Sequence, residues 1–138
     1  MIVGIGTDII AVKRFAPWET YTLERLQKIY SEQELAACKK KNVFDVQKLA
    51  TRFAAKEAFF KALSATLVTL GFTQQQFSFM FTCTYVEVLA GEWGVPVLHV
   101  DWQAFERKCG VCLPLLQVSV SLSHEREYAG AFVIIEKI

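Results

Sequence analysis

The stretch Arg52-Phe53-Ala54-Ala55-Lys56-Glu57-Ala58-Phe59-Phe60-Lys61-Ala62-Leu63 carries the strongest helical signal in the chain. Its alanine, leucine, lysine and glutamate residues favour helix, and neither glycine nor proline interrupts it. At about 100° per residue, Phe53, Phe60 and Leu63 fall on one apolar side. We therefore predict a long helix from about Val46 to Leu63 or somewhat beyond, with its apolar side against the rest of the fold.

Glu57 and Lys61 stand one helical turn apart, so an acid and a base project together from the rim of that apolar side. An exposed pair that merely stiffens the helix is the simpler interpretation of this spacing. The functional alternative is a carboxylate and an ammonium group held together for chemistry. The sequence motifs near the two ends of the chain, described below, favour the functional alternative.

The composition predicts one domain, residues 1–138, with a core of its own. Hydrophobic residues make up 53%, charged residues 21%, and the mean hydropathy is +0.28. This apolar surplus indicates that part of the surface forms a subunit interface. The formal charge of +1 predicts binding to neither nucleic acid nor membrane. The N-terminal third nevertheless has a local basic excess: Lys13, Arg14, Arg25, Lys28, Lys39, Lys40 and Lys41.

We expect a cytoplasmic location. The opening segment Met1–Gly6 lacks a basic leader and reaches Asp8 too soon for the apolar core of a secretion signal. The most apolar region, 63–83, is broken by Gly71 and by Gln74-Gln75-Gln76, where we predict a loop, and falls short of the ~20 residues of a transmembrane helix. The four cysteines have no disulfide-scaffold spacing and fit a reducing compartment.

Cys109-Gly110-Val111-Cys112 has the C-x-x-C form, which can serve thiol redox chemistry or supply half of a zinc site. No second Cys/His pair at ligand spacing accompanies it. Two unrelated cysteines near a helix–strand junction are the favoured interpretation.

Met1 to Ile10 is rich in isoleucine and predicts a buried strand. Because side chains alternate along a strand, Asp8 shares a face with two glycines. A glycine in a strand often marks a close approach to the backbone, and a carboxylate beside such a gap suits a metal ion. An aspartate that caps a helix at the strand end is the other interpretation. The predicted faces are Val3, Ile5, Thr7 and Ile9 on one side, and Ile2, Gly4, Gly6, Asp8 and Ile10 on the other.

Helical signals continue in the N-terminal half. Pro17 is placed for a first helical turn, and 20–28 keeps helical spacing. Ser31 and Glu34 have the form of a capping box, which predicts a second helix through about Lys40, with a stop at Asn42.

The C-terminal half is mainly β in pattern, and the whole order of elements predicts an α+β fold: a mostly antiparallel sheet packed against a long helix, with helices on one side. The predicted elements are a hairpin of strands 82–89 and 95–100, a short helix 101–108 closed by Gly110, and strands 117–124 and 128–135 joined by a turn at 125–127.

His124 ends the predicted strand 117–124, whose opposite face carries Ser119, Ser121 and Ser123. A lone histidine at a strand end is more often structural than functional. Its position at the lip of a serine-lined strand, before a charged turn, also suits the mouth of a ligand site. Both interpretations stay open at this point.

Three separated motifs now stand in order along the chain. They are Gly6-Thr7-Asp8-Ile9 followed by Arg14; the segment 52–58 with Lys61-Ala62; and Ser121-Leu122-Ser123-His124-Glu125 with Tyr128-Ala129. Together, at this total length, they resemble the holo-[acyl-carrier-protein] synthases, the short single-domain branch of the 4′-phosphopantetheinyl transferase superfamily. The resemblance covers most of the chain and implies the fold of that superfamily.

This resemblance implies transfer of the 4′-phosphopantetheine arm of coenzyme A onto a serine of an apo acyl carrier protein, for fatty acid biosynthesis, with release of 3′,5′-ADP. It implies that Asp8 and Glu57 hold a Mg²⁺ ion against the pyrophosphate of coenzyme A. Such a division of labour suits Mg²⁺, which takes one or two protein carboxylates and fills its other positions with water and phosphate oxygens. Lys61 would pair with the same phosphates, and Glu57 is the nearest candidate for the base that accepts the serine proton.

The resemblance also implies that Arg52 and His124 lie near the nucleotide end of coenzyme A, at its 3′-phosphate. Arg14, Arg25 and Lys28 lie where the family presents a basic face to the acidic carrier protein, which suits electrostatic steering. The resemblance further implies a homotrimer with active sites between subunits, as in the short members of this branch, so we expect a homotrimer here.

The chain departs from the family pattern in two places. Ser64-Ala65-Thr66 stands where the family commonly has a Gly-Thr-Gly turn, which predicts a longer helix and altered backbone contact with the phosphates. Gly94-Val95-Pro96 replaces a usual Gly-Lys-Pro and removes one positive charge. These departures leave a second hypothesis, a non-catalytic module that docks onto a carrier protein and has a degenerate coenzyme A site. The intact Asp8, Glu57 and Lys61 argue against it.

Overall fold

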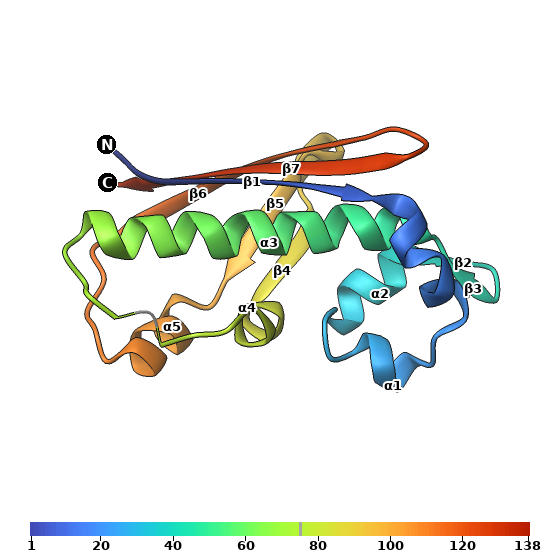
Figure 1. Cartoon of the computed structure of the whole chain (residues 1–138), viewed down its shortest axis with the longest axis horizontal. Coiled ribbons are helices and arrows are strands. Elements are labelled where there is room, and N and C mark those ends of the chain that lie inside the picture. The colour runs from blue at the N-terminus through green and yellow to red at the C-terminus, as the bar shows by residue number, and fades with distance from the viewer. Residues whose placement is uncertain (75) are drawn as a thin grey trace.

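The computed structural model describes residues 1–74 and 76–138, so Gln75 of the predicted glutamine loop lies outside the described residues. A long helix, α3 (Val46–Thr69), runs through the molecule for 24 residues (Figure 1). It begins where the Asp45 side chain accepts hydrogen bonds from the backbone N–H groups of Gln47 and Lys48. The predicted helix is confirmed, and it extends past Leu63 through Ser64-Ala65-Thr66, as the absence of glycine there predicts.

An antiparallel sheet in the order β1-β7-β6 covers one side of α3 (Figure 1). Its strands are β1 (Ile2–Ala11), β6 (Leu116–His124) and β7 (Tyr128–Lys137). The two chain ends lie side by side, because Met1 and Lys137 exchange two backbone hydrogen bonds of 2.8 and 3.0 Å. The predicted terminal strands and the α+β architecture are therefore confirmed. The predicted faces of β1 are wrong at its start, because an irregularity between Ile2 and Gly4 leaves Val3 buried with the glycines and Ile2 exposed. The face of Ile5 and Ile9 is exposed rather than buried.

The glycines of β1 explain how closely the sheet and α3 pack. A Cβ atom at Gly6 would overlap the carbonyl oxygen of Ala58, and one at Gly4 would overlap the side chain of Thr66. The group that approaches these glycines is thus α3 itself rather than a ligand. Asp8 continues the same face of β1 one step beyond Gly6, so this contact also sets its distance from α3.

Replacement of Gly6 by alanine is expected to lower the free energy of unfolding by about 3 kcal/mol, because the new methyl group meets helix backbone that cannot rotate away. Urea denaturation checks this value. Gly130→Ala is the matched control: its nearest non-neighbour atom lies 3.5 Å from the added Cβ, and its effect should stay within about 1 kcal/mol. Equal losses in the two variants would contradict the explanation.

The shorter helices lie on the side of α3 away from the sheet, and a separate hairpin of β4 and β5 crosses α3 (Figure 1). The shorter helices are η1 (Val12–Thr20, a 3-10 helix), α1 (Leu23–Leu26), α2 (Glu32–Cys38), α4 (Phe79–Tyr85) and α5 (Trp102–Cys109). The hairpin consists of β4 (Val86–Ala90) and β5 (Pro96–Val100), joined through the 3-10 helix η2 (Glu92–Gly94). A second, very short hairpin is formed by β2 (Lys39–Lys40) and β3 (Val43–Phe44).

Phe53 and Phe60 face this second layer, as the helical spacing predicts. The Phe53 ring lies 5.0 Å from that of Phe79, and the Phe60 ring lies 5.4 Å from that of Phe77, both edge to face. Such aromatic contacts join α3 to the segment that follows it.

The predicted strand 82–89 is wrong in its first half, where α4 forms instead. Ser78 caps this helix by accepting a hydrogen bond from the backbone N–H of Phe81. The β-branched and aromatic residues of α4 raised the strand signal, and the cap together with packing against α3 outweighs it. The hairpin itself, and the helix α5 with its left-handed Gly110 (φ +64°), are confirmed.

Two N-terminal boundaries also differ from prediction. The helical turn at Pro17 belongs to η1, which begins earlier, and extended backbone at Tyr21 and Thr22 separates it from α1. The capping box of Ser31 and Glu34 is confirmed, but α2 ends at Cys38 because residues 39–44 form a small hairpin.

Among the described residues, no helix has the length and apolar character needed to cross a bilayer.

Candidate active site

Asp8 and Lys61 form an ion pair at the edge where β1 meets α3. The Lys61 Nζ atom lies 3.1 Å from Asp8 Oδ1 and 3.0 Å from the carbonyl oxygen of Thr7. The Lys61 side chain is 51% exposed, so it can leave this position at little cost. The other carboxylate oxygen, Asp8 Oδ2, is buried and has no hydrogen-bond partner among the described residues.

Glu57 lies on α3 one turn before Lys61 and shares this environment. Burial raises the pKa of its carboxyl above the ordinary value, and the nearby Asp8 carboxylate raises that pKa further. Lys61 and Arg14 act in the opposite direction. The structure thus brings Asp8, Glu57 and Lys61 together, with Arg14 at their border.

Two carboxylates that repel each other, one of them with a buried free oxygen, form a donor set for a hard dication. In the described part of the chain, no group of three or more His, Cys, Asp or Glu side chains is arranged to hold a metal ion. Mg²⁺ commonly binds through one or two protein carboxylates and takes its other ligands from water and substrate oxygens, so Asp8 and Glu57 are candidate ligands for it.

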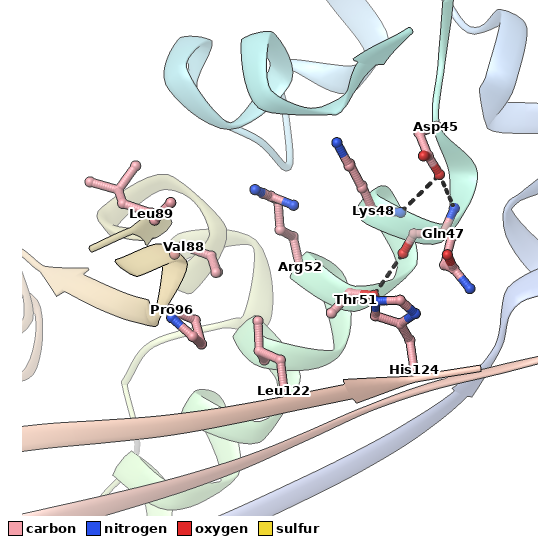
Figure 2. Close-up of a pocket in the computed structure, with 12 residues that line it drawn as sticks. Asp45, Gln47, Lys48, Thr51, Arg52, Val88, Leu89, Pro96, Leu122 and His124 are labelled. Carbon is pink, nitrogen blue, oxygen red and sulfur yellow. Dashed lines mark hydrogen bonds between the residues drawn. The ribbon is translucent and has the colours of Figure 1, made fainter. Parts of the chain in front are cut away.

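A second site is a pocket of about 350 Å³ between α3, the β4–β5 hairpin and the end of β6. Figure 2 shows Arg52 and Lys48 projecting from α3 into this space, with His124 at its edge. The Arg52 Nε atom is buried, and no residue in the described part of the chain accepts a hydrogen bond from it. Apolar walls complete the pocket, formed by Val88, Leu89, Pro96 and Leu122. Cations above an apolar cleft suit a ligand with both a phosphate and a flat ring.

The pocket and the carboxylates lie on opposite flanks of α3. Ala58 and Ala62 face β1, because they meet its glycines. At about 100° per residue, Glu57 lies roughly 100° to one side of Ala58, and Arg52 lies roughly 120° to the other. Accordingly, the described residues that line the pocket do not include Asp8, Glu57 or Lys61.

The basic surface consists of exposed Arg14, Arg25 and Lys28 on η1 and around α1. The Arg25 guanidinium lies 3.8 Å from the ring centre of Tyr21, a cation–π contact. Arg25 and Lys28 border a shallow depression whose floor includes Trp18, Ile29 and Met80. Arg14 is close enough to Glu57 to lower the pKa of its carboxyl, so the basic surface begins beside the carboxylates.

Sequence reasoning missed Lys48 and Lys56. Lys48 precedes Arg52 by one helical turn, and this i,i+4 spacing predicts that both side chains project from the same face of the helix and so into the same pocket. Lys56 is wholly buried in an ion pair with Glu34, 22 residues away, which no local pattern signals. Cys109 is half-buried and Cys112 exposed, and both are free thiols.

Comparison with known proteins places these features in one family. Residues 4–132 match the model of the 4′-phosphopantetheinyl transferase superfamily. A holo-[acyl-carrier-protein] synthase of Treponema pallidum is 38% identical over 99% of this chain and 97% of its own length. The solved holo-(acyl-carrier-protein) synthase of Bacillus anthracis, in complex with CoA (3′,5′-ADP), is 29% identical, with a TM-score of 0.64 over 100% of this chain and 99% of that one. The ACPS–CoA complex of Chronobacterium ammoniagenes, at 21% identity, shares the fold with a TM-score of 0.76 over 98% and 97% of the two chains.

Proposed function

Because the chain belongs to the holo-[acyl-carrier-protein] synthases of the 4′-phosphopantetheinyl transferase superfamily, we propose that Asp8, Glu57 and Lys61 are the residues with which it transfers phosphopantetheine. The reaction moves the 4′-phosphopantetheine arm of coenzyme A to a serine of apo acyl carrier protein and releases 3′,5′-ADP. The observation that carries the proposal is the buried, unpartnered Asp8 Oδ2 beside Glu57.

Asp8 and Glu57 would hold Mg²⁺ here, since their oxygens match its ligand preference and their mutual repulsion is relieved by a cation. When bound, the ion neutralises charge on the pyrophosphate and helps to align the in-line attack. Lys61 exchanges its contact with Asp8 for the phosphate oxygens of coenzyme A, as its exposure permits. Glu57 would accept the proton of the carrier serine, directly or through water, because it is the nearest candidate base beside the phosphates.

Arg52, Lys48 and His124 would bind the nucleotide end of coenzyme A in the 350 Å³ pocket. The unpartnered Nε–H of Arg52 is available for the 3′-phosphate, and the apolar walls offer contact for adenine. Val95, where the family commonly has lysine, is 58% exposed and lies on the β4–β5 hairpin that forms one wall. The absence of a lysine charge at position 95 would weaken phosphate binding only at the edge of the pocket.

The proposed nucleotide pocket and the carboxylates lie on opposite flanks of α3, and this separation favours a site that combines two chains. We propose that they meet across a subunit boundary in a homotrimer. Ile5, Ile9 and Phe132, on the face of the sheet away from α3, are 56%, 74% and 43% exposed. Burial of this apolar face between copies would supply the driving force for assembly. We further propose that the enzyme works in the cytoplasm, where its free thiols stay reduced, and serves fatty acid biosynthesis.

Intact-mass spectrometry tests the reaction. Apo acyl carrier protein incubated with this enzyme, coenzyme A and Mg²⁺ should gain the mass of one phosphopantetheine arm, and should gain none when a chelator removes the metal. Gain at an unchanged rate without divalent metal would reject the metal assignment. No gain with several carrier proteins, while coenzyme A and carrier still bind, would favour the non-catalytic module instead.

The metal can also be tested without turnover, through the pH dependence of stability. The raised pKa means that folded Glu57 holds its proton more tightly than the unfolded chain does. Ionisation of Glu57 therefore costs stability as the pH rises from its ordinary pKa of 4.5 through the raised value. Without metal at neutral pH, Glu57→Gln should melt a few degrees above wild type, and the difference should vanish below pH 4.5.

Added Mg²⁺ should raise the melting temperature of wild type and leave that of Glu57→Gln almost unchanged, because ligand binding stabilises only the form that binds. Differential scanning fluorimetry measures both effects. Equal stabilisation of the two proteins by Mg²⁺ would show that the ion binds elsewhere.

A further inference from the structure

Lys56 and Glu34 form an ion pair in which both side chains are 0% exposed. The Lys56 Nζ atom donates to Glu34 Oε1 at 2.7 Å, to the carbonyl oxygen of Ile29 at 2.6 Å and to that of Cys83 at 3.0 Å. An ammonium group has three N–H donors, so all of its hydrogen-bonding capacity is used.

Glu34 is equally well satisfied. Its Oε1 also accepts from the backbone N–H of Ser31 at 2.9 Å, and its Oε2 accepts from that of Val88 at 3.0 Å. The pair therefore joins four segments to α3: the loop after α1, the start of α2, the end of α4, and β4.

Stability alone does not account for this arrangement. Apolar residues of similar volume often stabilise a core as well as a buried ion pair does, because they avoid the cost of desolvating two charges. Directional hydrogen bonds offer something that apolar packing lacks, a defined placement of each segment relative to the others.

The segment that most needs such placement carries Arg25 and Lys28. Its helix, α1, has four residues, which is too short to hold its conformation alone. Leu26 anchors it by burial, and two hydrogen bonds tie its C-terminal side to α3. One runs from the Tyr30 hydroxyl to the carbonyl oxygen of Leu49 at 2.7 Å, and the other from Lys56 to Ile29, the residue after Lys28.

We propose that Lys56 is a positioning residue for carrier-protein binding. It directly precedes Glu57 on α3 and donates a hydrogen bond to the carbonyl oxygen of Ile29, so it links the helix that carries Glu57 to the segment that carries Arg25 and Lys28. An acidic carrier protein docked on that surface then presents its serine at Glu57. This inference rests on the proposed function, specifically on the basic surface as the carrier site.

The double variant Lys56→Met/Glu34→Gln tests it. Both buried charges disappear together, and the new amide oxygen can still accept from the Val88 N–H, which preserves the wall of the nucleotide pocket. Steady-state transfer should show a KM for apo carrier protein about tenfold above wild type, while the KM for coenzyme A stays within about twofold. The fall of kcat/KM with added salt should also become shallower, because misplaced cations steer less effectively.

A purely structural role predicts a different result. Loss of folded enzyme lowers the apparent kcat and leaves both KM values and the salt dependence unchanged. Leu67→Ala, at a buried position eleven residues further along α3, supplies that pattern as a matched control. A wild-type carrier KM in the folded double variant would overturn the proposal. Should the double variant not fold, Lys56→Gln/Glu34→Gln decides, since it also removes both charges and keeps polar groups in the core; its expected carrier KM is about threefold above wild type, and an unchanged KM is the contrary result.

The Arg25→Ala/Lys28→Ala variant, assayed under the same conditions, tests the basic surface separately from the role of Lys56. If this variant keeps the wild-type carrier KM, the basic surface itself is wrongly assigned and the inference falls with it. If its carrier KM rises while that of Lys56→Met/Glu34→Gln does not, the basic surface stands and only the role of Lys56 is rejected.

Discussion

The Glu57→Ala variant should transfer phosphopantetheine at least about a thousandfold more slowly than wild type. Two losses combine: one of the two carboxylates that would hold Mg²⁺ disappears, and so does the candidate acceptor for the serine proton, a role worth roughly 10²–10⁴ in rate. The fold should persist, because removal of Glu57 also removes its repulsion with Asp8. Initial rates from intact-mass spectrometry at saturating coenzyme A measure the effect.

Glu32→Ala is a suitable control, since Glu32 is an exposed carboxylate on α2 outside the proposed site. It should transfer at a rate close to wild type. Asp8→Ala should also slow transfer strongly but less than Glu57→Ala does, because it removes a ligand of the ion and leaves the candidate proton acceptor in place. A Glu57→Ala variant within tenfold of the wild-type rate would remove Glu57 from the proposed chemistry.

Mixing two inactive variants should restore activity if each active site combines two chains. In Arg52→Ala the carboxylates remain and the nucleotide pocket is damaged, whereas in Glu57→Ala the reverse holds. When equal amounts are unfolded and refolded together, about one site in four should draw an intact carboxylate half and an intact pocket half from neighbouring copies. Activity of the mixture should therefore reach about a quarter of the wild-type value, far above that of either variant.

Asp8→Ala mixed with Glu57→Ala is the matched control for this experiment. Both changes damage the same half of the site, so no combination of copies yields an intact one, and activity should stay at background. Recovery in the first mixture and not in the second would assign Arg52 and Glu57 to different subunits of one site. An absence of recovery in both, with subunit exchange shown by mass spectrometry of tagged chains, would place the whole site within one chain.

Local sequence determined most of the elements. The uninterrupted run around Glu57 predicted α3, the Ser31–Glu34 capping box predicted the start of α2, and alternation predicted the strands at both chain ends. These features depend on backbone preferences and caps that act within a few residues, so they can be recognised without knowledge of the fold. The motif resemblance then named Asp8, Glu57, Lys61, Arg52 and His124 as candidates for the site.

Only the tertiary structure decided how these parts meet. The glycines of β1 are approached by α3, the aromatic segment 79–85 folds as α4 instead of a strand, and Lys56 pairs with Glu34 rather than joining Glu57 and Lys61. The structure also distributes Arg52 and Asp8 to opposite flanks of one helix. Each of these outcomes depends on groups distant in sequence that compete for the same buried space. A buried charge must be paired or hydrogen-bonded, and its partners are set by the tertiary fold, so the local sequence pattern does not identify them.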